Sequence, residues 1–522
     1  MPLMSFQRPQ ALCLPSRKTC AMNDRLDLAA WNAAPLDPRY AALGAPYHQP
    51  VAPTPLTQPR LLHHSAALAR ELGLDDAAMD SPALLATLAG NHPWPGYVSH
   101  ASVYAGHQFG TFVPQLGDGR ALMIAELRTH GGRHLELQLK GAGRTPYSRG
   151  ADGRAVLRSS IREYLCSEAM HALGVPTTRC LSVAGAADPV FRETTETAAV
   201  VCRVAPSFVR FGHFEFFYHR GAHQTLAPLA DHIIDTHFPH LAGQPDRHAA
   251  WLGEVVERTA RLMAQWQTLG FCHGVMNTDN FSILGLTIDY GPFGFMDHFH
   301  PHHICNHSDG EGRYAYSAQP EVGQWNCAQL LQATLPLLPG TPEQAVEIAQ
   351  EIYARYAPAY AQAALRGWAD KLGLRELRDG DADLLNNWLG ILHRGKSDFT
   401  RSFRHLASVR TGVDTPASGV REEIADLAAF DAWIVDYRAR LMAEQNTDDT
   451  ARAERMNRVN PKYILRNHLA QATIEQAQQG DTAELDRLAK LLARPYDEQP
   501  AMERYAAEPP EAQRHIEVSC SS

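Results

Sequence analysis

The sequence lacks the features that mark several specialised classes of protein. Its nine cysteines include no Cys-x-x-Cys pair, and an odd, scattered set is typical of reduced cysteines rather than of a disulfide framework. No stretch approaches the roughly 18 consecutive apolar residues of a membrane-spanning helix. Positive charge is scarce, because 48 Lys and Arg residues face 57 Asp and Glu residues, for a net charge of −9. A basic face for nucleic acid is therefore not expected. Together these absences predict a cytoplasmic protein without a membrane or nucleic-acid partner.

What remains is the composition of an ordinary globular protein. Apolar residues make up 45% and charged residues 20% of the 522 residues, which is enough for a sizeable core. Residues 1–21 carry three basic side chains and no acidic one, a composition that transit peptides share. Because no amphipathic apolar stripe is present, we expect residues 1–22 to be a disordered leader or to result from a start placed upstream of Met22.

The hydrophobic pattern predicts an α+β fold, because strand signals dominate the first half of the chain and helix signals the second. We expect an N-terminal arm with short helices over residues 23–100, a strand-rich lobe over residues 101–215 and a helical lobe with a cysteine-containing tail over residues 216–522. His134–Lys140 alternates leucine with polar residues, which is typical of a half-buried strand. Glu444–Arg455 is polar and is expected to be a surface loop. The other expected strands are Ala121–Leu127, Val183–Ala184 and Ala198–Val204. The expected helices are His63–Leu72, Pro82–Ala89, Ala155–Leu173, Ala249–Leu269, Pro320–Leu338, Thr341–Ala357 and Asp383–Leu392.

Two motifs in the strand-rich half carry residues suited to phosphate. Gly117-Asp118-Gly119-Arg120 is a tight turn whose small residues would let backbone amides approach a phosphate, although any hairpin can carry such a turn. Lys140 ends an apolar strand, and Glu163 follows in the middle of the next expected helix. A strand Lys held by a helix Glu is how protein kinases position a Lys against nucleotide phosphates, whereas a lone Lys at a strand end more often reaches solvent.

Two further motifs in the helical half carry oxygen ligands and a candidate base. His273–Asn280 reads His-x6-Asn, and Asp289–Gly291 reads Asp-Tyr-Gly. Asn and Asp oxygens from adjacent loops suit Mg²⁺, which shares its site with substrate phosphates, although each motif alone would also serve a turn. The order of all four motifs predicts a protein-kinase-like, two-lobed fold. Val275 occupies the position at which kinases carry their catalytic Asp, so a standard kinase is disfavoured and Asp279 becomes the candidate base.

Five longer stretches of the sequence carry a family resemblance. They are YAGHQFGTFVPQLGDGRA, QLKGAGRTPYSRGADGRAVLRSSIREYL, VVCRVAPSFVRFG, HGVMNTDNFSILGLTIDYGPFGF and the terminal VSCSS. In these stretches the chain resembles the SelO family, also called YdiU or selenoprotein O, whose members have a kinase-like fold and act as protein adenylyltransferases. The matches reach from about Tyr104 to the C-terminus.

The resemblance implies an activity and a set of site residues. ATP would bind in a flipped orientation, so that its α-phosphorus faces a Ser, Thr or Tyr hydroxyl of a protein substrate and pyrophosphate leaves. Mg²⁺, or alternatively Mn²⁺, is the implied cofactor. By the family's pattern Asp279 is the proton acceptor, Asn280 and Asp289 bind the metal, and Glu163 pairs with Lys140. The implied ATP-binding residues are Gly117, Gly119, Arg120, Lys140, Asp152, Gly153, Arg203, Arg210 and Asp289.

The resemblance also implies a redox element. Family members carry a cysteine or selenocysteine near the C-terminus, which is Cys520 here, and its partner would be Cys305 in the family's ICN motif. A disulfide between them would tether the tail across the active-site lobe, although the sequence does not establish that the two residues are close. Without the family, a tail cysteine is merely exposed and oxidisable.

Three alternatives to adenylyl transfer stay open. One is UMP transfer from UTP with Mn²⁺, since the choice of base depends on the shape of the pocket. Another is a protein or small-molecule kinase, against which Val275 argues. The third is a non-catalytic pseudokinase scaffold, which would not need the candidate base Asp279.

Overall fold

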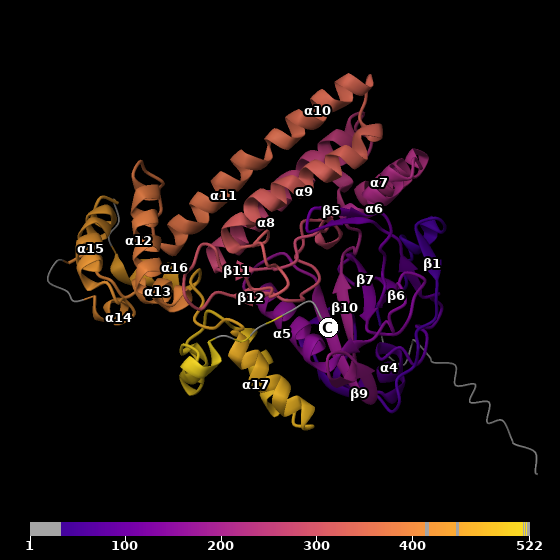
Figure 1. The fold of residues 1–522 in the computed structure, drawn as a ribbon, viewed down its shortest axis with the longest axis horizontal. Helices are drawn as coiled ribbons and strands as arrows, with labels where there is room; N and C mark the ends of the chain where they lie inside the picture. Colours follow the sequence, from indigo (N-terminus) through magenta and orange to yellow (C-terminus); the bar gives the residue numbers. More distant parts are fainter. Residues whose placement is uncertain (1–32, 413–416, 445–447, 515, 517, 519–522) are drawn as a thin grey trace, which may run out of the picture.

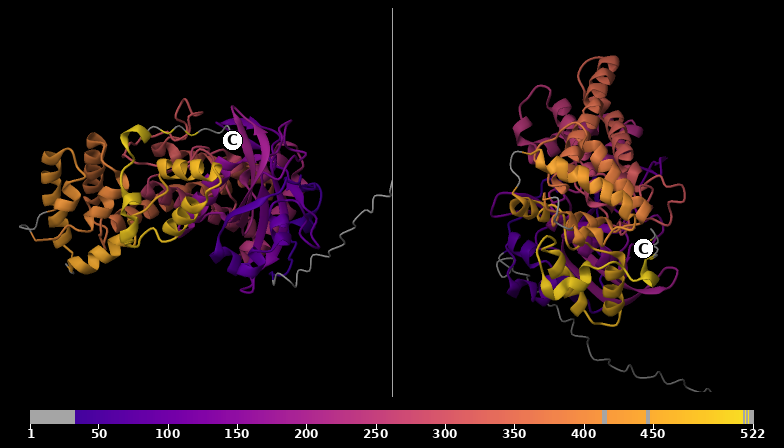
Figure 2. Two further views of the ribbon diagram at one scale, coloured as in Figure 1. Left: turned by 90° about the horizontal axis from the view of Figure 1, so that it is seen from below. Right: turned by 90° about the vertical axis from the view of Figure 1, so that its left-hand side faces the viewer.

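The computed structural model describes residues 33–412, 417–444, 448–514, 516 and 518. The predicted leader, residues 1–22, and Cys520 lie outside this part of the chain. The main β-sheet lies at one end of the molecule and the helices of residues 381–457 lie at the other, with the long helices of residues 247–371 between them (Figures 1 and 2). A large sheet combined with many helices is the α+β class that the sequence predicted.

The main sheet is antiparallel, with strand order β1-β3-β6-β7-β10-β9-β2 and with β8 paired to β10. The segment expected to be an arm supplies both outer strands, because β1 pairs with β3 and β2 pairs with β9. These strands are β1 (His48–Pro50), β2 (Arg60–His64), β3 (His100–Ser102), β6 (Ala121–Arg128), β7 (His134–Lys140), β8 (Ala155–Val156), β9 (Arg179–Phe191) and β10 (Thr195–Ala205). Two small sheets pair β4 (Gly106–Gln108) with β5 (Thr111–Val113) and β11 (Phe271–Cys272) with β12 (Gly294–Phe295).

Strand β7 has the predicted bounds, but it is buried on both faces rather than on one. The side chains of Glu136, Gln138 and Lys140 are 1%, 0% and 9% exposed. Each of them has a polar partner: Glu136 accepts a backbone N–H at 2.8 Å, Gln138 accepts from Arg203, and Lys140 Nζ lies 2.6 Å from Glu163. The polar face of β7 therefore meets a buried polar site instead of water.

Helix α5 (Leu157–Ala172) packs against β9 and β10 and carries Glu163 toward the sheet. Helix α8 (Arg247–Leu269) ends at Gly270, whose left-handed φ of +68° suits glycine and sends the chain into β11. The remaining helices are α2 (Ala66–Glu71), α3 (Asp76–Met79), α4 (Pro82–Leu88), α6 (Phe211–His219), α7 (Leu226–His237), α9 (Gln319–Thr334), α10 (Pro342–Ala354), α11 (Tyr356–Lys371), α12 (Asp381–Gly395), α13 (Phe399–Leu406), α14 (Ser418–Arg421), α15 (Leu427–Met442), α16 (Asp449–Asn457), α17 (Asn467–Gln478) and α18 (Ala483–Leu492).

Two predictions of local structure are wrong. The helix expected over His63–Leu72 starts later, because His63 and His64 belong to β2 and Ser65 caps α2 by accepting the Leu68 N–H. Strand pairing with β9 satisfies that backbone in place of a helical turn.

The surface loop expected over Glu444–Arg455 instead contains most of α16. Asp448 caps this helix by accepting the backbone N–H groups of Thr450 and Ala451 at 2.9 and 3.0 Å. Arg452 and Met456 are buried on its inner face, and Ala453 packs against the same hydrophobic cluster as Met456. These contacts dock a helix that is otherwise polar.

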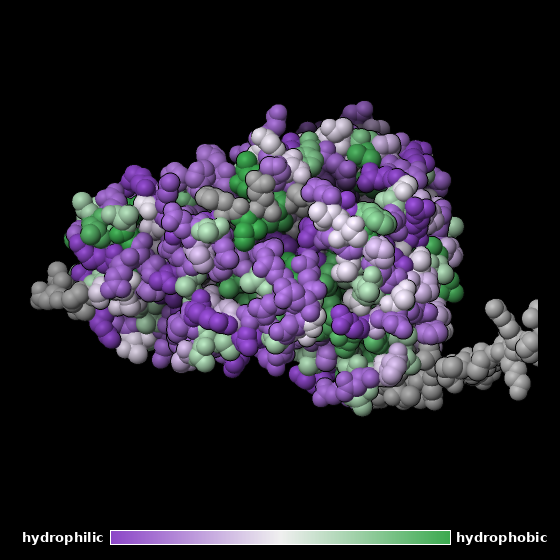
Figure 3. Space-filling model, turned by 60° about the horizontal axis from the view of Figure 1, so that its bottom comes forward, coloured by the Kyte–Doolittle hydropathy of each residue, from purple (hydrophilic) through white to green (hydrophobic). Residues whose placement is uncertain are grey.

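The hydrophobic core has two parts. The larger part joins the sheet to α5, α8, α9 and their neighbours, and the smaller part lies among α12, α13 and α15. Within the described residues no helix is both long and apolar enough to cross a membrane. Figure 3 shows a face on which hydrophilic residues predominate and hydrophobic residues gather in small groups.

Candidate functional site

A cleft of about 540 Å³ lies between the main sheet and the loops that follow β11. Neither Glu163 nor Cys305 lines the cleft. Glu163 forms an ion pair with a residue that does, Lys140. The structure brings together every residue predicted to bind ATP or metal or to act as the base; these are Gly117, Gly119, Arg120, Lys140, Asp152, Gly153, Arg203, Arg210, Asp279, Asn280 and Asp289.

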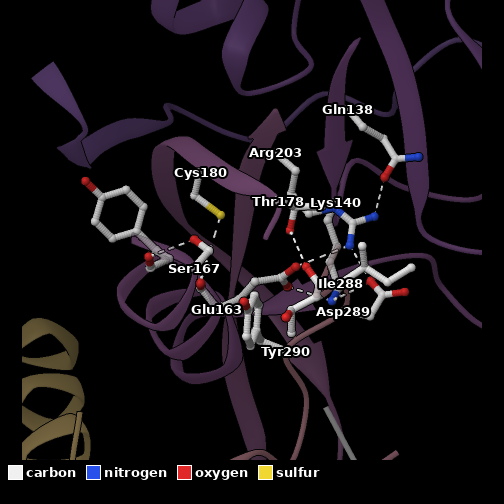
Figure 4. A network of polar contacts seen from close by, with 12 residues as sticks. Gln138, Lys140, Glu163, Ser167, Thr178, Cys180, Arg203, Ile288, Asp289 and Tyr290 are labelled. Atoms are coloured by element: carbon white, nitrogen blue, oxygen red, sulfur yellow. Dashed lines mark hydrogen bonds and ion pairs between the residues drawn. The ribbon is translucent and has the colours of Figure 1, made fainter. Parts of the chain in front are cut away.

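A network of charged side chains forms the back of the cleft (Figure 4). Lys140 Nζ lies 2.6 Å from Glu163 Oε2 and 3.5 Å from Asp289 Oδ1. Arg203, from β10, donates to both carboxylates and to Gln138. Its side chain is 1% exposed, and burying an unpaired guanidinium would be costly. The two acids and the Gln138 amide therefore offset the burial of Arg203 and fix its position.

Asp289 is the anionic centre of this network. Its Oδ1 accepts from Arg203, and its Oδ2 accepts from Arg210, which also donates to the backbone oxygen of Asp279 at 2.8 Å. Burial alone would raise the pKa of Asp289, but Arg210, Arg203 and Lys140 outweigh it and hold that pKa well below its usual range. Asp289 therefore stays ionised. Its φ of +58° is left-handed, a strained backbone conformation for a residue other than glycine.

The Gly117–Arg120 turn is shaped by close packing. Gly117 has a φ of +130°, and a Cβ there would lie 2.6 Å from the Tyr147 ring, so no side chain fits. Asp118, which had no predicted role, accepts the backbone N–H of Ser102 at 3.0 Å and the hydroxyl of Tyr104 at 3.3 Å. Burial raises the pKa of Asp118. Its carboxyl group therefore ties the turn to the end of β3.

A second glycine turn forms the mouth of the cleft. Gly153 has a φ of +70°, and a Cβ there would lie 2.1 Å from the backbone oxygen of Gly143. Arg192 donates to both oxygens of Asp152, at 2.8 and 3.0 Å. These hydrogen bonds lower the pKa of Asp152. The loop between β9 and β10 thus holds this turn against the cleft.

Asp279 lies on a single 3₁₀ turn, Thr278–Asn280, and is 7% exposed. Burial raises its pKa to about 7, although Arg210 opposes the rise. Gln108 Nε2 donates to its Oδ2 at 3.4 Å. Its Oδ1 is buried without a hydrogen-bond partner among the described residues. A buried acceptor of this kind requires an explanation, and a ligand in the cleft supplies one.

The two other motif residues of the helical half have different tasks. Asn280 Nδ2 donates to the backbone oxygen of Val275 at 2.9 Å, which leaves its amide oxygen to face a ligand. His273 is 1% exposed, its Nε2 bonds the Ile288 oxygen at 2.8 Å, and its ring stacks on Trp266 at 5.2 Å. His273 therefore joins the Asp279 loop to the strand-like segment that ends at Asp289.

Cys305 lies under the start of the same loop. Its Sγ is 3.5 Å from the backbone oxygen of Cys272, and a Cβ on Gly274 would lie 2.7 Å from that Sγ. The disulfide with Cys520 stays a prediction, because Cys520 lies outside the described residues.

The structure also shows a support for the Asp279 loop that the sequence reasoning missed. Glu215, on α6, is 0% exposed, and it accepts from the Thr278 hydroxyl at 2.6 Å and from His107 at 2.8 Å. The backbone N–H of His107 in turn donates to the hydroxyl oxygen of Thr278 at 2.7 Å. The sequence carried a signal for His107, because it stands in GHQFG, part of one of the family-like stretches, but no role was assigned to it.

Comparisons with known proteins identify the family of the chain. The family model described as "Protein adenylyltransferase SelO" matches residues 32–493. A curated "Protein nucleotidyltransferase YdiU" from Methylococcus capsulatus is 69% identical over 488 residues, which cover 94% of this chain and 96% of that protein. Proteins of the same name from Burkholderia thailandensis and Paraburkholderia xenovorans are 54% and 52% identical over 95% and 96% of this chain and 97% of each relative. The resemblance seen in the sequence is confirmed: the chain belongs to the SelO family of nucleotidyltransferases.

Proposed function

We propose that this enzyme transfers AMP from ATP to Ser, Thr or Tyr hydroxyls of proteins and releases pyrophosphate. The proposal is carried by the convergence of cations and oxygen ligands on one cleft, in which Lys140 lies 3.5 Å from Asp289 and Asp279 lines the same space. The printed names of the family model and of the relatives, protein adenylyltransferase and protein nucleotidyltransferase, support it.

The cations of the cleft would position and neutralise the triphosphate. Lys140, Arg120, Arg203 and Arg210 all line the cleft, and charge-assisted contacts to phosphate oxygens are the strong kind. Because adenylyl transfer breaks the bond between the α-phosphorus and the bridging oxygen, negative charge develops on the leaving pyrophosphate. Fixed cations at that place stabilise the transition state without reorganising.

Asp279 would act as the general base. It takes the proton of the acceptor hydroxyl while the hydroxyl oxygen forms its bond to the α-phosphorus. Its buried Oδ1 without a partner and its pKa of about 7 support this role. Val275, at the position of the kinase base, cannot take a proton, and this argues against a standard kinase. The flipped nucleotide, whose α-phosphorus faces the acceptor, is what the family resemblance implies.

Mg²⁺ is the cofactor that fits the donors of the cleft, with Mn²⁺ as an alternative. Asn280 offers an amide oxygen, and the ionised Asp289 has lone pairs beyond those that its arginines occupy. The described residues contain no cluster of three or more His, Cys, Asp or Glu side chains able to hold a metal. Mg²⁺ needs fewer, since one or two protein ligands with phosphates and water suffice. The bound ion would neutralise phosphate charge.

We also propose that the fold is kinase-like, with a strand-rich lobe over residues 101–215 and a helical lobe over residues 216–522. The cleft draws its residues 104–210 from the first part and its residues 275–292 from the second, which supports a nucleotide site between two lobes.

Transfer from labelled nucleotides tests the proposed function. The purified chain is incubated with a protein mixture, Mg²⁺ and ATP labelled at either the α or the γ phosphate. Label on protein from the α position only supports AMP transfer, and label from the γ position only refutes it in favour of a kinase. A parallel reaction with α-labelled UTP and Mn²⁺ decides between adenylyl and uridylyl transfer. Nucleotide binding without transfer of any label would instead indicate a scaffold.

A further inference from the structure

A second groove lies beside the nucleotide cleft and shares one wall with it. Phe109, at the tip of the β4–β5 hairpin, lines both spaces. The groove has a volume of about 680 Å³. Its lining comes from this hairpin, from the loop before α9 and from α9 itself; it comprises Phe109, Ser308, Asp309, Gly310, Glu311, Gly312, Arg313, Ala318, Glu321, Val322 and Trp325.

The shared wall is held in place by the loop of the proposed base. The backbone N–H of Phe109 donates to Asn277 Oδ1 at 3.2 Å and to the Tyr314 hydroxyl at 3.0 Å. Its φ is +50°, and its side chain is 40% exposed. The neighbouring Gln108 donates to Asp279. A left-handed backbone with an exposed ring is costly, so the hairpin tip is fixed where a ligand would pass from the groove to the base.

The groove presents negative charge between apolar walls. Asp309 is 3% exposed and accepts the backbone N–H groups of Arg313 and Tyr314 at 3.0 and 2.8 Å, so it serves the loop itself. Glu311 and Glu321 are exposed to solvent. These two carboxylates are therefore the charges that the groove offers to a ligand.

The arginine of the groove is already engaged. The Arg313 guanidinium lies 5.0 Å from the centre of the Trp325 ring. A Cβ on Gly110 would lie 3.1 Å from Arg313 Cζ, so the hairpin tip packs directly on this side chain. Phe109, Val322 and Trp325 form the apolar walls. A cation with an apolar stem, such as a Lys or Arg side chain, matches this combination.

We propose that this groove binds the acceptor polypeptide and selects a Lys or Arg a few residues from the acceptor hydroxyl; this rests on the proposed transfer to proteins. An extended chain advances about 3.3 Å per residue. A segment running past Phe109 therefore places its hydroxyl in the cleft and its basic side chain between Glu311 and Glu321. A substrate with acidic residues in that place is repelled.

Peptide binding tests the groove without requiring catalysis. Fluorescent 12-residue peptides with one Ser and with basic, neutral or acidic flanks are titrated with the full chain, Mg²⁺ and a non-hydrolysable ATP analogue. The variant is the double reversal Glu311→Lys/Glu321→Lys. Its matched control is Glu347→Lys/Glu351→Lys, the same charge change on exposed residues of α10. Affinity for the ATP analogue reports that each variant is folded.

We expect the basic peptide to bind about tenfold more tightly than the acidic one, since two exposed ion pairs contribute at most about fivefold each. The groove variant should lose this preference while the control keeps it, and 0.5 M NaCl should weaken it. Equal or undetectable binding of all three peptides, or an unchanged preference in the groove variant, overturns the proposal. Label transferred from the γ phosphate would refute adenylyl transfer and leave this binding result standing, so the two failures are distinguishable.

Discussion

Glu126→Gln tests how the segment before the sheet is attached. Glu126, on β6, is 0% exposed. Its Oε2 accepts the Tyr40 N–H at 2.7 Å, and its Oε1 accepts the Ala41 N–H at 2.8 Å and the Tyr97 hydroxyl at 2.7 Å. The carboxylate thus satisfies three donors, and a neutral amide of the same size cannot accept on both sides.

The expected loss of stability follows from this geometry. In the more favourable orientation of the glutamine amide, its oxygen still accepts from the Ala41 N–H and the Tyr97 hydroxyl, while its NH₂ group faces the Tyr40 N–H. One buried donor then lacks an acceptor, at about 1–3 kcal/mol, and two hydrogen bonds lose their charge assistance, at about 1 kcal/mol each. The pKa of Glu136 is raised by burial and also by the negative charge of Glu126. Removing the Glu126 charge relieves this repulsion and stabilises the folded state by about 1 kcal/mol. The net loss should be about 3 kcal/mol.

Hydrogen exchange measured by mass spectrometry checks the local effect. Exchange of the Tyr40 and Ala41 amides should accelerate by about 100-fold, which corresponds to about 3 kcal/mol. Glu71→Gln is the matched control, because Glu71 pairs with the exposed Arg133, and it should change stability by less than about 1 kcal/mol. Unchanged exchange at these amides in the Glu126 variant would refute the reasoning.

Three other perturbations address the cleft and the core. Asp279→Asn keeps the size of the side chain but cannot take a proton, so the transfer rate should fall by about 10²–10⁴ while the nucleotide Kd, measured by calorimetry, stays within about twofold; full activity would exclude Asp279 as the base. Lys140→Met should raise the nucleotide Kd by about 10–100-fold through loss of a charge-assisted contact, and an unchanged Kd would remove Lys140 from the phosphate site. Acid should destabilise the fold, because burial lowers the pKa of four histidines to about 3 or 4, so that below pH 6.5 the unfolded chain takes up protons that the folded chain cannot. The four histidines are His100, His213, His232 and His237. At pH 5.5 the free energy of unfolding should fall by about 1.4 kcal/mol for each of them. A urea midpoint that stays constant from pH 7.5 to 5.5 would contradict this expectation.

The sequence predicted the elements that have a regular hydrophobic period, and it predicted the order of the motifs. Strand β7 and helix α8 appear close to their predicted bounds, because strict alternation and a long amphipathic stripe are strong local signals. The burial of β7 was not predictable, since a polar side chain facing water and one facing a buried partner give the same pattern. The partners that distinguish the two, such as Arg203 from β10 and Glu163 from α5, come from farther along the chain.

The candidate site was predicted in its members and in one support, the Glu163 partner of Lys140, but not in the support of the Asp279 loop. Lys140, Asp279 and Asp289 could be named because each stands in a recognisable motif. Glu215 could not, because a glutamate in an aromatic-rich helix gives no hint that it will lie buried against Thr278. Its role exists only after α6 and the Asp279 loop have been brought together.

The placement of β1 and β2 at the two margins of the sheet has a consequence for how the chain is made. β2 is synthesised early, yet its partner in β9 emerges about 120 residues later, as the pairing of His64 with Ser182 shows. At the usual speed of translation this delay is roughly 10 s. During that time an unpaired strand rich in histidine and leucine leaves the ribosome. Contacts so distant in sequence fold slowly, so the backbone groups of β2 that bond to β9 in the finished enzyme stay unpaired throughout this interval.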